Sequence, residues 1–325
     1  MTLRILAIGD VVGKAGLSHL QATLHTQKQA LGVDFCIVNG ENASEIKGIC
    51  KHDAEQLLYA GADLITLGNH AYSAPDVGSF LDDRPDVIIR PANFPATNPG
   101  YGYTVADVKG VRILCINLLG TVNMQPLDNP FLTLERILDA QKGNYDIAIL
   151  DLHAEATSEK YAVARAFDGK FAAIFGTHTH VATADLQILP GGTGYVTDLG
   201  MTGPEGGIIG AKTEPVLRML RDHMPARFSV ADGRVRAHAV LFCIDTDTRR
   251  TTSAKQLIFK YFIFATQKFH IRRCRYGKEK RHADSALAPE SAQTLYFGLL
   301  ALDGARLAGQ GGQADLRLSQ KRRHL

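Results

Sequence analysis

Short apolar runs alternate with segments of helical periodicity along much of this chain, and this alternation is the feature that most restricts its fold. Apolar runs at Leu3–Gly9, Phe35–Asn39 and Asp63–Leu67 predict buried strands. Leucines at helical spacing predict a helix over residues 16–31, and the pattern of residues 52–60 predicts another. Such alternation is typical of parallel strands joined by right-handed helical crossovers. The sequence therefore predicts an α/β fold.

The chain continues this pattern up to about residue 259 and adds two expected hairpins. Lys109-Gly110 separates two strand-like runs, and Asp232-Gly233 separates Ala226–Val230 from Val235–Ile244, so we expect two antiparallel pairs. The other expected elements are helices over Pro75–Leu81, Thr133–Gln141 and Ser158–Phe167, and strands over Val87–Ile89, Asp146–Leu152, Phe171–Phe175 and Tyr195–Thr197. Frequent glycines over residues 190–210 predict a loop region there.

The formal net charge of +3 is the sum of two unlike parts of this 325-residue chain. Residues 1–259 contain 23 Lys and Arg against 28 Asp and Glu, whereas residues 260–325 contain 13 against 5. A basic terminal segment is typical of nucleic-acid binding, and it also fits a segment that is not part of the fold. We expect a folded domain over residues 1–258 and a poorly ordered basic extension over residues 259–325.

The sequence also argues against membrane-spanning and secreted classes of protein. It has no uninterrupted apolar run of about 20 residues, which a transmembrane helix needs. The apolar run after Arg4 is too short for a signal peptide. The five cysteines form no Cys-x-x-Cys pair, and this odd, scattered set favours a reducing compartment. We therefore expect a cytoplasmic protein that does not enter a membrane.

Polar side chains of the kinds that bind metal ions follow five of the apolar runs. They are Asp10, Glu41, Asn42, Asn69, His70, His153, His178 and His180. Because ligands bind outside the carboxyl ends of strands in α/β sheets, we expect these side chains to meet at one edge. Taken singly, Asp10 fits a helix N-cap and His153 fits a core histidine. Glu41 and Asn42, taken alone, fit a turn. Five such strand ends together predict a metal site.

His178 and His180 carry the strongest single signal for this site. Alternate residues of an extended segment point to one face, so we expect both imidazoles to face the same metal site. Without His70, the set contains seven side chains, which is more than one tetrahedral zinc takes, and none is a cysteine. These nitrogen and oxygen ligands predict two divalent ions bridged by Glu41, with iron, manganese and zinc as candidates. Metal pairs about 3.5–4 Å apart are typical of enzymes that catalyse in-line phosphoryl displacement.

Seven motifs, several of which contain the residues of this set, occur along the chain. They are Ile8-Gly-Asp-Val-Val-Gly13, Asn39-Gly-Glu-Asn42, Thr66-Leu-Gly-Asn-His70, Arg90-Pro-Ala-Asn-Phe-Pro95, Asp151-Leu-His-Ala-Glu-Ala-Thr-Ser-Glu-Lys160, Gly176-Thr-His-Thr-His180 and Thr197-Asp-Leu-Gly-Met-Thr-Gly-Pro204. In this order they resemble the calcineurin-like metallophosphoesterase superfamily, and closely its YmdB-type branch of bacterial 2′,3′-cyclic-nucleotide 2′-phosphodiesterases. Val12, Glu41 and Ala71 depart from the general superfamily pattern, and the YmdB-type branch shares these departures. The resemblance covers residues 3 to about 250.

The resemblance implies a layered α/β/β/α sandwich with two mixed sheets, and a site for two metal ions. It implies that one ion is held by Asp10, Glu41, Asn42 and His180, and the other by Glu41, Asn69, His153 and His178. Iron or manganese is favoured, and His70 is implied as the general acid. On this basis we expect a metal-bridging hydroxide to attack phosphorus in line while His70 protonates the departing 2′ oxygen. The product would be a 3′-nucleotide.

Asp151 lies two residues before His153, on the same face of an expected strand. Two interpretations stay open for this carboxylate. It orients a metal ligand through a hydrogen bond, or it is simply solvated at the end of the strand.

Other functions stay open at this point. One is a metallophosphatase or phosphodiesterase for another phosphoester, such as RNA ends or a phosphoprotein. A second is an RNA-binding or regulatory protein with a secondary metal site, because residues 270–282 contain eight Lys, Arg and His. Few aromatic residues accompany this basic cluster, which argues against single-strand binding. The basic segment also fits a non-homologous extension, for instance from a shifted reading frame. A homo-oligomer stays open as well.

Overall fold

The computed structural model describes residues 1–260. These residues form two mixed β-sheets, of which the larger has eight strands. Its eight strands are ordered β2 (Asp10–Val11), β12 (Met201–Pro204), β13 (Val235–Asp245), β1 (Thr2–Ile8), β3 (Phe35–Asn39), β4 (Leu64–Thr66) and β5 (Ile88–Ile89), with β14 (Arg250–Lys260) paired to β13. Strands β1, β3, β4 and β5 are parallel, as the alternating pattern predicts. Strand β13 is antiparallel to both β1 and β14.

The second sheet has six strands and is again mixed. Their order is β10 (Gln187–Ile188), β11 (Gly194–Val196), β9 (Ala173–Thr177), β8 (Ile147–His153), β7 (Val111–Leu119) and β6 (Tyr103–Val108). The middle strands are parallel, whereas β6 and β7 form the expected hairpin. Lys109 and Gly110 at its tip have φ angles of 56° and 81°. Positive φ at both central residues is what a type I′ hairpin turn requires.

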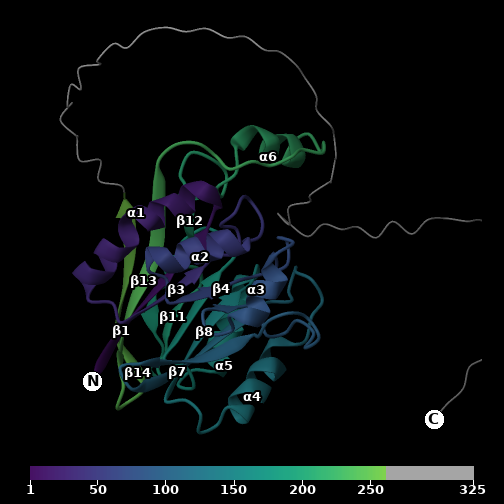
Figure 1. The fold of residues 1–325 in the computed structure, drawn as a ribbon. Helices are drawn as coiled ribbons and strands as arrows, with labels where there is room; N and C mark the ends of the chain where they lie inside the picture. Colours follow the sequence, from purple (N-terminus) through teal and green to yellow (C-terminus); the bar gives the residue numbers. More distant parts are fainter. Residues whose placement is uncertain (261–325) are drawn as a thin grey trace, which may run out of the picture.

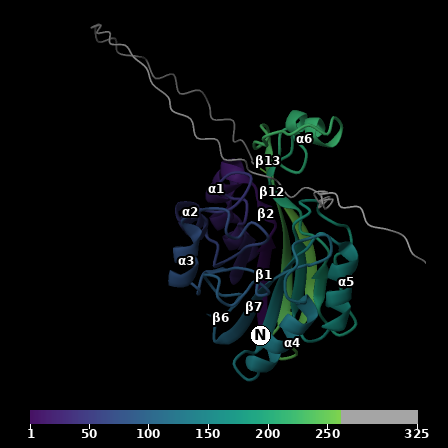
Figure 2. The same cartoon turned by 90° about the vertical axis from the view of Figure 1, so that its right-hand side faces the viewer.

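Helices cover the outer face of each sheet, so the molecule is layered α/β/β/α (Figure 1). The larger sheet is covered by α1 (Gly13–Leu31), α2 (Lys51–Ala60) and α3 (Val77–Asp83). The smaller sheet is covered by α4 (Pro130–Ala140) and α5 (Thr157–Ala166). Figure 2 shows these two groups on opposite sides of the strands, with α6 (Thr213–Leu220) standing apart at one end. The expected sandwich with two mixed sheets is confirmed.

The alternation of side chains along β1 shows how the layers are held together. Leu6 and Ile8 join the cluster between the larger sheet and its helices, whereas Leu3, Ile5 and Ala7 join the cluster between the two sheets. Successive strand residues point to opposite faces, and both faces of this strand are covered. A strand in such a position needs apolar residues on both faces, which explains the unbroken apolar run in the sequence.

The second expected hairpin is wrong. Residues 226–229 form no strand, and β13 pairs with β14 instead. The turn between them is closed by the carboxylate of Asp245, which accepts hydrogen bonds from the backbone N–H groups of Asp247 and Thr248. Side chains of Asp commonly stabilise turns in this way. Within the expected glycine-rich loop region, β12 lies between β13 and β2 and pairs with both strands. Helix α6 follows that region.

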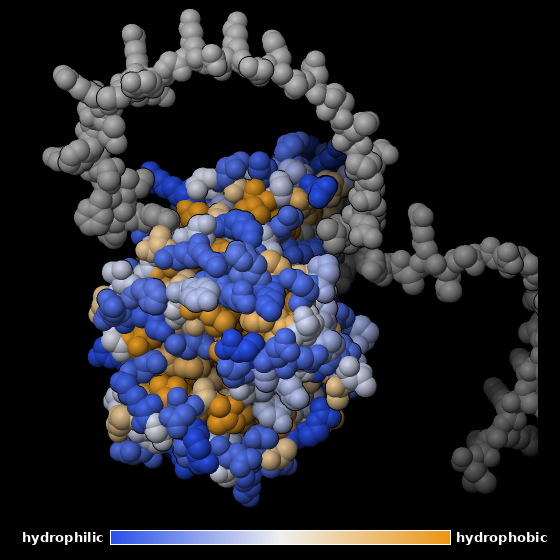
Figure 3. Space-filling view, viewed as in Figure 1, coloured by the Kyte–Doolittle hydropathy of each residue, from blue (hydrophilic) through white to orange (hydrophobic). Residues whose placement is uncertain are grey.

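Strand β14 ends at Lys260, so residues 259 and 260 belong to the larger sheet. The rest of the expected basic extension, residues 261–325, lies outside the described part of the chain. No helix among residues 1–260 is both long enough and apolar enough to cross a membrane. On the face shown in Figure 3, hydrophobic residues form separate patches among hydrophilic ones.

Candidate metal centre

The polar residues singled out in the sequence lie at the carboxyl ends of parallel strands in both sheets, as expected. Asp10 begins β2 directly after β1, Glu41 and Asn42 follow β3, Asn69 and His70 follow β4, His153 ends β8, and His178 and His180 follow β9. The two sheets therefore deliver their polar strand ends to one place. Carboxylate and amide groups come from the larger sheet, together with His70, and the other three imidazoles come from the smaller one.

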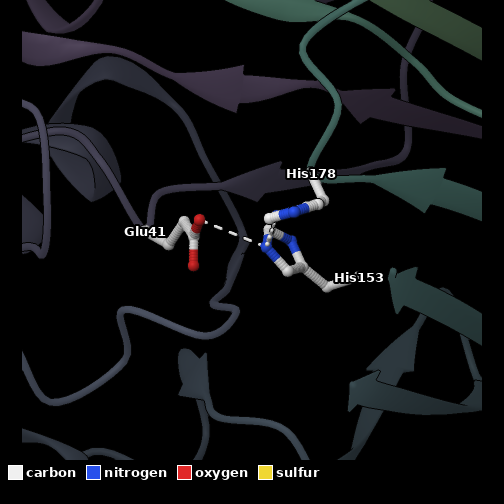
Figure 4. Close-up of side chains that lie close together, drawn as sticks. All are labelled: Glu41, His153 and His178. Carbon is white, nitrogen blue, oxygen red and sulfur yellow. Dashed lines mark hydrogen bonds and ion pairs between the residues drawn. The ribbon is translucent and has the colours of Figure 1, made fainter. Parts of the chain in front are cut away.

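One half of the site gathers around the ring of His153. Its Nε2 atom lies 3.2 Å from Glu41 Oε1, 3.1 Å from His178 Nδ1 and 3.0 Å from Asn69 Oδ1. Figure 4 shows Glu41 and His178 converging on this nitrogen, and the ligand atoms of the three residues lie within 4.8 Å of one another. Burial lowers the pKa of His153 to about 4, so its imidazole is neutral at neutral pH. A neutral imidazole can donate its lone pair to a metal ion.

The other half of the site contains Asp10, Asn42 and His180. His180 Nε2 lies 3.8 Å from Asp10 Oδ1 and 3.4 Å from Asn42 Nδ2. The opposite ring nitrogen, Nδ1, lies 2.9 Å from the carbonyl oxygen of Ile209, which can only accept a hydrogen bond. His180 therefore carries a proton on Nδ1 and turns Nε2 towards Asp10. Asn42 Nδ2 also donates to Glu41 Oε1 at 3.1 Å, which joins the two halves.

His70 borders the first half of the site and contacts Glu41 and Asn69. Its backbone N–H donates to Glu41 Oε2 at 3.1 Å, and its ring Nε2 lies 3.3 Å from Asn69 Nδ2. The residue is only half-buried, unlike Glu41 and His153. Burial lowers the pKa of the imidazole, although the Glu41 carboxylate acts in the opposite direction. This partly open position suits a group that contacts substrate.

The buried polar atoms of the site fit a bound cation. Asp10 is completely buried, yet Asp10 Oδ1 has no hydrogen-bond partner among the described residues, and neither does Asn42 Oδ1. Burial raises the pKa of Asp10 well above its usual value, and the nearby carboxylates of Asp198 and Glu41 raise it further. Buried polar groups without partners are rare and costly. Oxygen ligands with open lone pairs beside imidazole nitrogens are the donor set that iron and manganese accept.

The expected extended conformation around His178 and His180 is wrong, although both imidazoles reach the site. Their φ angles are 101° and 63°, so the chain turns sharply after β9, and the two rings serve different halves of the site. Positive φ is unfavourable for residues other than glycine, so the surroundings must hold this turn in place.

A buried ion pair that sequence reasoning missed holds this turn. Lys160 Nζ lies 2.8 Å from both Thr177 O and Asp198 Oδ2, and the N–H of Thr179 donates to the same carboxylate at 3.1 Å. Both members of the pair are fully buried. Lysine and aspartate are rarely buried completely unless they are paired. Their positions within two of the seven motifs were the only signal in the sequence.

Gly68 occupies a position where a side chain would strike the site directly. A Cβ atom added there would lie 2.3 Å from both Glu41 Oε2 and His153 Nε2. We expect Gly68→Ala to displace these two ligands and to weaken Mn²⁺ binding by about ten- to a hundredfold, since overpacking costs about 1–3 kcal/mol. Isothermal titration calorimetry with Mn²⁺ measures this loss.

Gly78→Ala is the matched control, because a Cβ atom there would lie no closer than 3.4 Å to any neighbour. This variant is expected to bind Mn²⁺ as the unchanged protein does. Equal affinities for Gly68→Ala and Gly78→Ala would contradict the crowded position of Gly68.

Comparisons with known proteins match the same part of the chain as the seven motifs. A family model described as YmdB-like protein matches residues 6–257. A Bacillus subtilis (strain 168) protein named 2′,3′-cyclic-nucleotide 2′-phosphodiesterase is 40% identical over 256 residues, covering 79% of this chain and 97% of the relative. The crystal structure of a hypothetical protein from Thermus thermophilus has a TM-score of 0.75 and 37% identity, covering 79% of this chain and 99% of that chain. A structure described as a novel phosphatase from Mycoplasma pneumoniae has a TM-score of 0.75 and 35% identity, covering 80% and 94%.

Proposed function

The chain belongs to the YmdB-like protein family, and from this membership we propose that it hydrolyses 2′,3′-cyclic nucleotides to 3′-nucleotides. The observation that carries the proposal is the convergence of Glu41, His153 and His178 at the strand ends, in a chain that is 40% identical to a relative with that activity in its name. A site of carboxylate, amide and imidazole groups supports metal-dependent hydrolysis of a phosphoester. The name of the relative supports the cyclic nucleotide as substrate.

Two divalent metal ions, iron or manganese, are the cofactors in this proposal. Asp10, Asn42 and His180 would hold one ion, Asn69, His153 and His178 would hold the other, and Glu41 would contribute to both. Its carboxylate supports this shared role, because Oε1 contacts a group in each half of the site. When bound, such a metal pair activates water at neutral pH and stabilises the charge that develops on phosphoryl oxygens.

His70 is the general acid in this proposal. When the bond between phosphorus and the 2′ oxygen breaks, that oxygen needs a proton, and histidine can supply one near neutral pH. Burial of the ring opposes its protonation, whereas the negative charge of a bound phosphodiester favours it. The backbone hydrogen bond to Glu41 would fix the position of His70 relative to the phosphoryl group.

A panel of substrates tests this function with the full chain loaded with Mn²⁺ or Fe²⁺. We expect 2′,3′-cyclic AMP to be opened to 3′-AMP, with a higher kcat/KM than 3′,5′-cyclic AMP or 3′-AMP. Product chromatography distinguishes 3′-AMP from 2′-AMP. Release of 2′-AMP, or a clear preference for a monoester, would overturn the proposed reaction and favour a metallophosphatase for another phosphoester.

We propose that this reaction takes place in the cytoplasm. Cys36, Cys50, Cys115 and Cys243 all have free thiols, which supports a reducing compartment. RNA binding through the basic cluster at residues 270–282 stays a prediction, because that cluster lies outside the described residues. The homo-oligomer stays a prediction as well.

A further inference from the structure

A polar cluster lies beneath the candidate metal centre and is centred on Asp151 of β8. This carboxylate is only 1% exposed, so the interpretation as a solvated strand end is wrong. It accepts hydrogen bonds from Thr66 Oγ1 at 2.5 Å, from Asn39 Nδ2 at 3.2 Å and from Thr177 Oγ1 at 2.7 Å. The three donors come from β4, β3 and β9, respectively. Asp151 therefore links the ends of the two sheets through hydrogen bonds, next to His153.

Donor and acceptor capacities decide the direction of the hydrogen bonds that lead from Asp151 to His153. A carboxylate can only accept, so the single hydroxyl proton of Thr177 is used in the bond to Asp151. His153 Nδ1 lies 2.9 Å from the same hydroxyl oxygen. Since Thr177 has no second proton to donate, this contact requires a proton on His153 Nδ1. In the neutral ring, the other nitrogen, Nε2, then carries the lone pair.

This tautomer matters for the metal centre because the ring of His153 turns Nε2 towards the other proposed metal ligands. Nε2 is the nitrogen that faces Glu41, Asn69 and His178, at 3.2, 3.0 and 3.1 Å. With the opposite tautomer, a proton on Nε2 would occupy the direction in which a metal ion must bind. Histidines that bind metals commonly donate their second N–H to a protein group, and that contact fixes ring and tautomer.

We propose that Asp151 and Thr177 are positioning residues that hold His153 in its Nδ1–H tautomer and so present Nε2 to the metal ion. This inference rests on the proposed metal-dependent function. The carboxylate polarises the hydroxyl, and the hydroxyl accepts from the imidazole. Neither residue belongs to the proposed ligand set, and in this proposal both act on the metal ion through His153.

Thr66 provides a matched control for the hydrogen bonds that lead from Asp151 through Thr177 to His153. Its hydroxyl donates to the same carboxylate and is equally buried, but no hydrogen bond links it to His153. Thr66→Val and Thr177→Val therefore remove the same chemical group from Asp151 without changing side-chain size much. Only Thr177→Val also removes the acceptor of the His153 proton. Thr177→Ser keeps that acceptor and should restore what Thr177→Val loses.

NMR of the imidazole nitrogens identifies the tautomer of His153 in the isotopically labelled, metal-free full chain. The variant His153→Asn serves to assign the signals of this residue. We expect His153 to be protonated on Nδ1 in the unchanged protein, in Thr66→Val and in Thr177→Ser. In Thr177→Val we expect a mixture of tautomers. This measurement involves neither metal nor nucleotide, so its result is independent of whether the chain hydrolyses cyclic nucleotides.

Calorimetric titration with Mn²⁺ gives the second readout. We expect Thr177→Val to bind Mn²⁺ about ten- to a hundredfold more weakly, the usual cost of removing such a contact, and Thr177→Ser to recover the affinity. Thr66→Val should stay close to the unchanged protein. Protonation of His153 on Nε2 in the unchanged metal-free chain would overturn the proposal. Equal losses of affinity in Thr66→Val and Thr177→Val would overturn it as well.

Discussion

Glu41→Gln is expected to bind at most one Mn²⁺ per chain and to lose about a thousandfold in kcat/KM, the equivalent of roughly 4 kcal/mol of transition-state stabilisation. The carboxylate of Glu41 is buried, and its Oε1 atom contacts His153 of one half of the site and Asn42 of the other. The substitution keeps the volume of the side chain but removes the negative charge that both ions would share. Elemental analysis of the purified protein and the rate with 2′,3′-cyclic AMP measure the two losses.

Glu159→Gln is the matched control for this prediction. Glu159 is also buried, but it accepts hydrogen bonds from the backbone N–H groups of Thr121 and Val122, neither of which belongs to the proposed ligand set. The control should retain two ions and its activity, with a lower melting temperature because a charged hydrogen-bond acceptor is lost. Two Mn²⁺ ions retained by Glu41→Gln would contradict the shared role of this carboxylate.

The position of the metal centre could be predicted because its residues are adjacent in sequence to strong local signals. Asp10, Glu41, Asn69 and His153 each stand at the end of a short apolar run or within four residues of it. Parallel strands bring such ends together whatever the details of the sheet. The layered arrangement of two sheets came from the resemblance to a family, because apolar runs do not reveal which strands share a sheet.

The remaining features depend on contacts between distant parts of the chain, which no local pattern reveals. Lys160 and Asp198 are 38 residues apart. The Asp232-Gly233 turn signal precedes β13 and predicts a hairpin with the segment before it, whereas β13 pairs with β14, which follows it. The positive φ angles of His178 and His180 are imposed by hydrogen bonds around them, since their own residue type disfavours this conformation. Nothing in the sequence distinguishes Thr177 from other threonines in strands, because its contact with the ring of His153 forms only in the folded chain.

His70→Ala is expected to lower kcat for 2′,3′-cyclic AMP by about a hundred- to ten-thousandfold, the usual contribution of a general acid, while both metal ions stay bound. Its backbone N–H, which donates to Glu41 Oε2, is kept by the substitution, and its ring lies beside Asn69 at the half-buried edge of the site. Removing it should therefore leave the proposed ligand set intact. His25→Ala, which changes an exposed histidine bonded to the carbonyl of Tyr59, is the control and should have unchanged kcat.

The choice of substrate separates a general acid from a residue that only shapes the site. A nitrophenyl phosphodiester has a leaving group that departs as a stable anion, so its hydrolysis needs little help from an acid, whereas the 2′ oxygen of a ribose needs a proton. If His70 supplies that proton, His70→Ala should hydrolyse the nitrophenyl ester at a rate much closer to that of the unchanged protein. Loss of the same factor with both substrates would show that His70 acts on binding or on the metal ligands, and not on the departing oxygen.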